Sequence, residues 1–370
     1  MRIRCTEDIS MLGQHHDTAV TLFSGGLDSS YLLHLLSTSG FKRIIALTID
    51  LGDDIDHDQI STVADHFGAE SIILDRKEIF AETAVIPAIS AQARYLGIYP
   101  ISASLSRPLI AQEAVKVAHA HNSQVILHTA NQSQNSLHRL NGAIEQLGFE
   151  GYYGTPYEFS ALTRQEKADA MAHAGLDFFK SRNHSGDSNL WCREFESGML
   201  DDPENFSAND EMYKWSRPPC HADETTIEVT FCKGRPTAIN SISLSPVDLI
   251  AELNRDVGRF GLGRFCGLEH LDAGEKVLEV REMPAAYLLM DAYRHLETAT
   301  LDFATLREKI TMEQTWTTEA IEGRWFAPQR KAAQAYIDTT SERISGTVDY
   351  RLDRTGATPF SIIAQSPLYL

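Results

Sequence analysis

Short apolar runs and helical segments alternate along the first half of the chain. Continuously apolar runs, which are typical of strands buried on both faces of a sheet, occur at 19–23, 43–51, 71–74 and 124–127. Leucines at helical spacing follow the first run over 29–39, and similar helical segments cover 59–67 and end at 121. This alternation predicts an α/β domain with a parallel sheet covered by helices on both faces.

The pattern changes after about residue 165. Apolar and polar residues alternate over 226–231, a turn follows at 233–236, and strand character continues over 237–244, which predicts an antiparallel hairpin. Helices are expected at 246–260, 286–298, 303–313 and 329–343, with a late strand at 344–352. We therefore predict a polar leader of little structure at 1–17, an α/β domain at 18–165 and an α+β domain at 166–370.

Composition narrows the classes of function. The chain of 370 residues is 43% hydrophobic and 23% charged, and no apolar run approaches the roughly 20 residues that a membrane span needs. The first residues lack the apolar stretch of a signal peptide, so we expect a cytoplasmic protein without a membrane partner. The five scattered cysteines predict reduced thiols rather than a zinc ribbon. A formal net charge of −18 argues against a nucleic-acid partner.

The segment from Phe23 to Ser30, which reads Phe-Ser-Gly-Gly-Leu-Asp-Ser-Ser, lies between a predicted buried strand and a helix. Gly25 and Gly26 allow a close approach of the backbone to a ligand, and the helix that follows offers its free N–H groups to an anion. No Gly-Lys-Ser/Thr follows, so the segment is not a Walker loop. The alternative is an ordinary Gly-rich turn with an Asp-Ser cap. The complete segment in this context favours a phosphate-binding loop.

This segment is the signature of the PP-loop ATP pyrophosphatases, and the chain resembles one family of that group, argininosuccinate synthase, from about Val20 to Ser366. Seven separate stretches carry the resemblance, at 20–30, 86–89, 99–111, 128–139, 185–198, 226–237 and 263–269. The resemblance implies an N-terminal domain like the adenine nucleotide alpha hydrolases and a C-terminal α+β synthetase domain. It also implies a ligase that adenylates the ureido oxygen of citrulline, releases pyrophosphate, and then joins the carbon to the amine of aspartate with release of AMP.

The resemblance carries expected roles onto positions of this chain. Asp28, Arg107 and Asn135 would serve the chemistry, with Asp28 orienting the loop or a magnesium ion. ATP would be held by Leu22, Phe23, Ser24, Gly25, Gly26, Leu27, Asp28, Ser29, Ser30, Ile49, Leu127 and Thr129. The citrulline pocket would include Tyr99, Ser104, Asn135, Arg139, Ser185 and Glu269. Mg²⁺ is expected to arrive with ATP, without ligands that can be named on the protein.

Five positions depart from the family pattern. Ala103, Asn131 and Ser136 stand where the family's aspartate site has two threonines and an aspartate. Glu194 and Arg281 stand where the citrulline site has a serine and a tyrosine, and they would read an amino acid differently or pair with each other. Lost contacts of this kind cost on the order of a few kcal/mol of recognition. We therefore expect retained adenylation with altered substrates, as in a specialised natural-product pathway.

Several alternatives stay open at this point. The chain is either a genuine argininosuccinate synthase of arginine biosynthesis, a tRNA-modifying PP-loop enzyme, or a non-catalytic nucleotide-binding relative. The acceptor is a small molecule or a peptide, and the second partner is an amine donor. The family's C-terminal helical tail, which contacts a neighbouring subunit in a tetramer, has no counterpart before Leu370. We therefore expect a homo-oligomer, a dimer or a tetramer, with the dimer favoured.

Overall fold

The computed structural model describes residues 1–52, 55–132, 134–160, 162–177, 179, 185–196, 198–208, 210–217, 224–271 and 274–370. Its N-terminal part is built on one six-stranded sheet in the order β1-β8-β7-β2-β3-β4, and all its pairings are parallel. The strands are β1 (Arg2–Ile3), β2 (Thr18–Leu22), β3 (Arg43–Asp50), β4 (Glu70–Asp75), β7 (Val125–Leu127) and β8 (Tyr152–Gly154). The predicted parallel α/β domain is confirmed.

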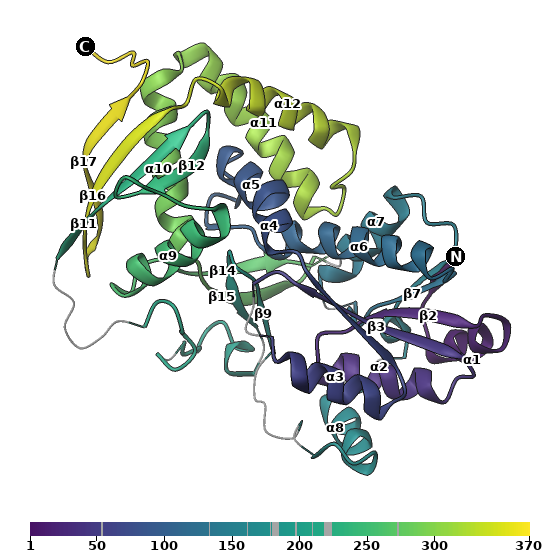
Figure 1. Cartoon of the computed structure of the whole chain (residues 1–370). Coiled ribbons are helices and arrows are strands. Elements are labelled where there is room, and N and C mark those ends of the chain that lie inside the picture. Colours follow the sequence, from purple (N-terminus) through teal and green to yellow (C-terminus); the bar gives the residue numbers. More distant parts are fainter. Residues whose placement is uncertain are drawn as a thin grey trace.

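Helices cover both faces of this sheet (Figure 1). On one face lie α1 (Thr6–His15), α2 (Leu27–Ser37), α3 (His57–His66) and α8 (Arg164–His173). On the other face lie α6 (Ala103–Ala120) and α7 (Ser136–Gln146). Alternate residues of the central strands enter the two cores, since Ile44 and Ala46 pack with the first group and Ile45 and Leu47 with the second.

The first seventeen residues are not an unstructured leader, and that expectation was wrong. Strand β1 adds a parallel edge to the sheet next to β8, and the amino group of Met1 donates to the Gly151 carbonyl at 2.8 Å. Helix α1 buries Ile9 and Leu12, and it approaches the chain so closely that a Cβ on Gly13 would lie 1.9 Å from the Ser39 carbonyl oxygen. Burial of these apolar side chains and the pairing with β8 order this segment, while its polar residues face the solvent.

The second half contains two antiparallel sheets, in keeping with the predicted α+β domain. The four-stranded sheet has the order β14-β15-β10-β9, with β9 (Ser185–Ser188), β10 (Arg193–Glu196), β14 (Arg264–His270) and β15 (Lys276–Glu282). The five-stranded sheet has the order β13-β12-β11-β16-β17. Its strands are β11 (Thr225–Cys232), β12 (Arg235–Ile239), β13 (Ile242–Ser243), β16 (Gly346–Asp353) and β17 (Gly356–Ala364).

Four helices accompany these sheets: α9 (Pro246–Gly258), α10 (Pro284–Thr300), α11 (Phe303–Ile321) and α12 (Pro328–Ser341). Helix α11 runs beyond the predicted end at residue 313, and Trp316 and Ala320 on its extension are buried. Between the two halves lie α4 (Lys77–Phe80), a π-helical turn (Ala81–Val85), α5 (Ile86–Ser90), β5 (Arg94–Tyr95) and β6 (Tyr99–Pro100). Short 3₁₀ turns occur at Pro156–Glu158 and Gly198–Leu200.

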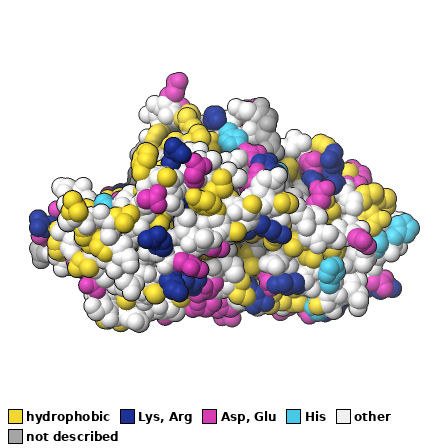
Figure 2. Space-filling model, turned by 90° about the horizontal axis from the view of Figure 1, so that it is seen from above, with side chains coloured by type: hydrophobic (Ala, Val, Ile, Leu, Met, Phe, Trp, Pro, Cys, Tyr) yellow, Lys and Arg dark blue, Asp and Glu magenta, His cyan; other side chains and the backbone are white. Residues whose placement is uncertain are grey.

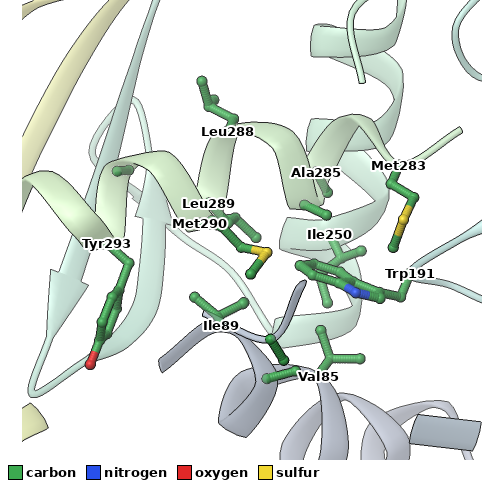
Figure 3. Packing of buried hydrophobic residues seen from close by; sticks show 14 of the residues in the cluster. Val85, Ile89, Trp191, Ile250, Met283, Ala285, Leu288, Leu289, Met290 and Tyr293 are labelled. Carbon is green, nitrogen blue, oxygen red and sulfur yellow. The ribbon is translucent and has the colours of Figure 1, made fainter. Parts of the chain in front are cut away.

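The largest apolar cluster joins both halves of the chain. Helix α10 runs through it, and Figure 3 shows the Trp191 indole directed into the cluster next to Ile250 of α9. Val85 and Ile89, from the segment around α5, lie in the same cluster. Burying apolar surface from both halves, at about 25 cal/mol per Å² removed from water, fixes how the halves meet. The cavity described below lies at this junction.

The thiols and the surface complete the picture. Cys5, Cys192, Cys232 and Cys266 are free thiols, and Cys220 lies outside the described residues. On the face shown in Figure 2, Lys and Arg side chains are interspersed with Asp and Glu side chains. In the part of the chain that the structure describes, no helix has both the length and the apolarity needed to cross a bilayer.

Candidate active site

The glycine-rich loop connects β2 to the first turn of α2. Gly25 has φ of +70°, a left-handed conformation that a side chain would strain, and Gly26 is the N-cap of the helix. The hydroxyls of Ser29 and Ser30 donate to the Gly26 carbonyl at 3.1 and 2.8 Å, which holds the loop against the helix. The free N–H groups and positive dipole end of α2 therefore point out of a fixed turn, which suits an anion.

Asp28 connects this loop to α8. Its Oδ1 lies 2.8 Å from Nζ of Lys167, and its carbonyl accepts a hydrogen bond from the Tyr157 hydroxyl at 2.8 Å. The Lys167 ammonium also lies over the Tyr157 ring, 4.4 Å from the centroid. The carboxylate thus orients the start of α2 through a partner that sequence analysis did not identify. A role of Asp28 toward magnesium stays a prediction.

A cavity of about 470 Å³ extends from this loop to the four-stranded sheet. Most of the residues expected for ATP and for the acceptor line it. They are Leu22, Phe23, Ser24, Gly26, Leu27, Asp28, Ser29, Ile49, Thr129, Ala103, Arg107, Asn135, Ser136, Arg139 and Glu194. The loop, the carboxyl ends of β3 and β7, and the N-terminal turns of α6 and α7 meet there, as expected for a ligand site on a parallel sheet.

The remaining expected residues lie outside this lining. Gly25, Ser30 and Leu127 support the loop and the sheet from behind, and Ser30 and Leu127 are buried. Ser104 is buried within α6, and the backbone N–H of Asn131 donates to Oε1 of Gln134 at 3.4 Å. Ser185 lies in β9 opposite Glu196, and its side chain lies outside what the structure describes. Tyr99, Glu269 and Arg281 form a buried network.

Glu269 is the centre of that network. Its Oε1 accepts from Arg139 Nη2 at 2.7 Å and from Asn135 Nδ2 at 2.9 Å. Its Oε2 accepts from Arg281 Nη2 at 3.0 Å and from the Tyr99 hydroxyl at 3.1 Å. Burial alone would raise the pKa of this carboxyl, but Arg139 and Arg281 outweigh it and lower the pKa to about 2. Glu269 is therefore a buried anion that ties α7 to β14.

Arg281 pairs with three carboxylates on one face of the four-stranded sheet. Glu194 faces it across the β10–β15 ladder, with Oε2 3.0 Å from Nη2, and Glu279 and Glu269 complete the set. Of the two alternatives expected for Glu194 and Arg281, the structure shows that they pair with each other. Arg281 also lies over the Tyr99 ring, 4.1 Å from its centroid.

Arg107 and Asn135 reach the cavity from the N-terminal half. Nη2 of Arg107 donates to Asp187 Oδ2 at 2.7 Å, and its Nε donates to the Ser136 hydroxyl at 3.0 Å. Besides Glu269, Asn135 donates to the His270 carbonyl at 2.8 Å. Arg107 and Asn135 are therefore fixed by contacts within the chain, and one partner of Arg107 is Ser136, a position of departure from the family pattern.

Three acidic lining residues were missed by sequence analysis: Asp187, Glu196 and Glu279. Asp187 and Glu196 fall within the 185–198 stretch of the resemblance, and Glu279 stands two residues before Arg281, the spacing that puts both on one face of a strand. Burial lowers the pKa of His128 to about 4, so its ring is neutral. Its Nδ1 accepts from the Ala130 N–H at 3.3 Å, and Nε2 then donates to Asn141 Oδ1 at 3.1 Å.

Within the described ranges, no three His, Cys, Asp or Glu side chains are grouped so as to hold a metal ion. The site chemistry is that of an anion-binding loop facing a set of arginines and carboxylates across one cavity. Such a site can hold a polyphosphate next to a polar acceptor.

Two family models match the chain in succession. Residues 18–177 match the N-terminal HUP domain of argininosuccinate synthase, and residues 184–364 match its C-terminal domain. The chain belongs to the argininosuccinate synthase family. That family consists of ATP-dependent, AMP-forming carbon–nitrogen ligases, so the expected enzyme class and the use of ATP are confirmed at the level of the family.

Curated relatives agree over most of their length. Argininosuccinate synthase of Dictyoglomus thermophilum is 32% identical over 339 residues, which are 91% of this chain and 85% of the relative. Argininosuccinate synthase of Lacticaseibacillus paracasei is 36% identical over 344 residues, which are 92% of this chain and 84% of the relative. The N-terminal model ends at residue 177 and the C-terminal model begins at residue 184. The N-terminal model therefore includes α8, which packs on α2.

Proposed function

We propose that this chain adenylates the oxygen of a ureido or amide acceptor and then joins the activated carbon to an amine. The observation that carries the proposal is the single cavity that connects the glycine-rich loop to Arg107, Asn135 and Arg139. A nucleotide on the loop and an acceptor beside these residues would share one cavity. Placing two reactants in this way supplies much of the rate enhancement that such a reaction needs.

The loop fits the nucleotide. Gly26 and Ser29 line the cavity at the N-terminus of α2, and Gly25 adopts a conformation that keeps side-chain atoms away from the loop's turn. We propose that ATP binds here with Mg²⁺, its phosphates on the helix N-terminus and its remaining groups toward Ile49 and Thr129. Asp28, fixed by Lys167, would orient the loop or the ion.

The reaction balances in two steps. The acceptor oxygen attacks the α-phosphate of ATP, and the α–β phosphate bond breaks to release pyrophosphate. The amine nitrogen then attacks the activated carbon and loses a proton, the carbon–oxygen bond breaks, and AMP leaves with the former acceptor oxygen. In this scheme Arg107 and Asn135 hold the reacting groups, and their existing hydrogen bonds reduce the ordering needed on binding.

The choice of substrates separates two forms of the proposal. The curated relatives are named argininosuccinate synthase, which favours citrulline and aspartate and therefore arginine biosynthesis. Ala103, Asn131, Ser136, Glu194 and Arg281 favour a changed pair of substrates. A specialised natural-product role receives no support from the comparisons, which agree better with the first form.

A pyrophosphate-release assay tests the proposal. Purified protein with Mg-ATP receives citrulline and then other ureido compounds, each with and without aspartate, and products are identified by mass spectrometry. Acceptor-dependent pyrophosphate supports adenylation, and argininosuccinate as the product establishes citrulline and aspartate as substrates. Binding of ATP without pyrophosphate release under any acceptor would refute the proposal and favour a non-catalytic nucleotide-binding protein.

A further inference from the structure

The second-domain part of the cavity lining is acidic. Among the described residues, this part contributes four carboxylates and no basic side chain, and the four are Asp187, Glu194, Glu196 and Glu279. They come from β9, β10 and β15, so one sheet presents them together. Arg281 lies behind them, with a side chain only 3% exposed, and it is not part of the lining.

The arginines of this region are already paired within the chain. Arg107 contacts Asp187, Arg139 contacts Glu269, and Arg281 contacts three carboxylates. A ligand carboxylate entering here would have to displace one of these pairs, of which those of Arg139 and Arg281 are buried, and then face the acidic residues. Removing one partner from a buried pair is costly, because the other charge stays buried without compensation.

The acidic residues, in contrast, have capacity for a positive partner. Oε2 of Glu194 lies 3.0 Å from Nη2 of Arg281, and Glu194 still lines the cavity. Burial, together with the neighbouring carboxylates, raises the pKa of Glu194 to about 7 and raises the pKa values of Glu196 and Glu279. A cation bound among these groups would relieve both the desolvation and the mutual repulsion.

We propose that the acceptor of this enzyme is a ureido amine, a compound with an ammonium group and no carboxylate at the end that enters the acidic part of the cavity. Glu194 is the residue that selects it, because it lines the cavity on the sheet face that also carries the other three carboxylates. Citrulline carries both groups at that end, so the acidic lining discriminates against its carboxylate. This inference rests on the proposed function and specifies its substrate class.

Three matched compounds test the inference with the wild-type protein. Citrulline has an ammonium and a carboxylate, 4-ureidobutylamine has only the ammonium, and 5-ureidopentanoate has only the carboxylate. Pyrophosphate release is measured for each with Mg-ATP, and binding is measured by the shift in melting temperature with α,β-methylene-ATP present. We expect kcat/KM for 4-ureidobutylamine to exceed that for citrulline by about tenfold or more, the scale of one charge-assisted hydrogen bond.

The outcomes separate this inference from the proposed function. Turnover that is faster with citrulline or 5-ureidopentanoate overturns the inference and leaves the function intact. Binding of 4-ureidobutylamine without pyrophosphate release supports the inference about the pocket and counts against adenylation. If neither binding nor turnover is seen with 4-ureidobutylamine, while another ureido compound reacts, the inference fails.

Glu194→Gln is the matching variant, with the exposed Glu150→Gln as its control. Glutamine keeps the size of the side chain and removes its charge, and Arg281 keeps two other carboxylates. The preference for 4-ureidobutylamine over 5-ureidopentanoate should fall by about tenfold in Glu194→Gln and stay unchanged in Glu150→Gln. An unchanged preference in a folded Glu194→Gln protein would show that this residue does not select the acceptor.

Discussion

The buried carboxylate of Glu269 should contribute strongly to the stability of the fold. It accepts hydrogen bonds from Arg139, Asn135, Arg281 and Tyr99, and the residue is only 3% exposed. Replacing it in Glu269→Gln removes the anion that compensates two buried guanidinium groups, and it turns an amide donor toward them. The substitution preserves side-chain volume, so a cavity does not contribute to the effect.

Two estimates of the magnitude agree. A pKa lowered from 4.5 to about 2 corresponds to about 3 kcal/mol of stability at neutral pH. Breaking a buried ion pair by removing one partner typically costs about 3–5 kcal/mol. For domains of this size, a loss of about 3 kcal/mol lowers the melting temperature by roughly 6–12 °C.

Circular dichroism melting curves of wild type, Glu269→Gln and the exposed control Glu150→Gln measure this effect. The sign of the pH dependence follows from the lowered pKa. The stabilisation is complete above the unfolded-state pKa of about 4.5 and is lost as the pH falls toward 2, so between pH 5.5 and 3.5 the advantage of wild type should shrink by about 1 kcal/mol. A fall in melting temperature under about 2 °C at pH 7, or an advantage that grows on acidification, would refute this account of the network.

Three further outcomes are expected. Gly25→Ala strains a residue at φ of +70°, so it should cost roughly 1 kcal/mol and weaken ATP binding several-fold by titration calorimetry, and an unchanged Kd would contradict the role of the loop. The ammonium of Lys309 lies 2.6 Å from the buried carboxylate of Glu297 and 2.7 Å from that of Glu313. Lys309→Met removes this partner, so urea unfolding should show a loss of about 3 kcal/mol of stability. A loss under about 1 kcal/mol would argue against a stabilising role of these ion pairs. Because the pKa of Glu194 is raised in the folded state, its ionisation destabilises the wild-type fold as the pH rises from about 4.5 through about 7. The melting temperature of Glu194→Gln relative to wild type should therefore increase from pH 5 to pH 8. A constant difference would contradict the raised pKa.

Sequence analysis predicted the elements whose pattern is local. The continuously apolar strands β2, β3 and β7 and the loop that begins α2 could be identified because burial on both faces leaves a direct trace in the sequence. Strand β1 could not be identified, since two residues carry no periodicity and their pairing with β8 joins residues about 150 positions apart.

Many residues of the candidate site could be predicted, but few of the contacts between them could. The resemblance pointed to Arg107, Asn135 and Arg139, and all three line the cavity. The partners Asp187 and Glu279 were missed, because a carboxylate in a strand is normally assigned to the solvent face. Only the register of β9, β10 and β15 places these acids beside the arginines, and register depends on long-range pairing.

The environment of Arg281 also imposes an order on the substitutions through which such a pocket can arise. In a chain that already has Glu269 and Glu279, a new arginine at 281 can form ion pairs with both carboxylates and is tolerated. A new glutamate at 194 without that arginine would add an uncompensated buried acid and destabilise the fold. The arginine must therefore precede the glutamate along a viable mutational path, and reverting Arg281 alone should be far more harmful than reverting Glu194 alone.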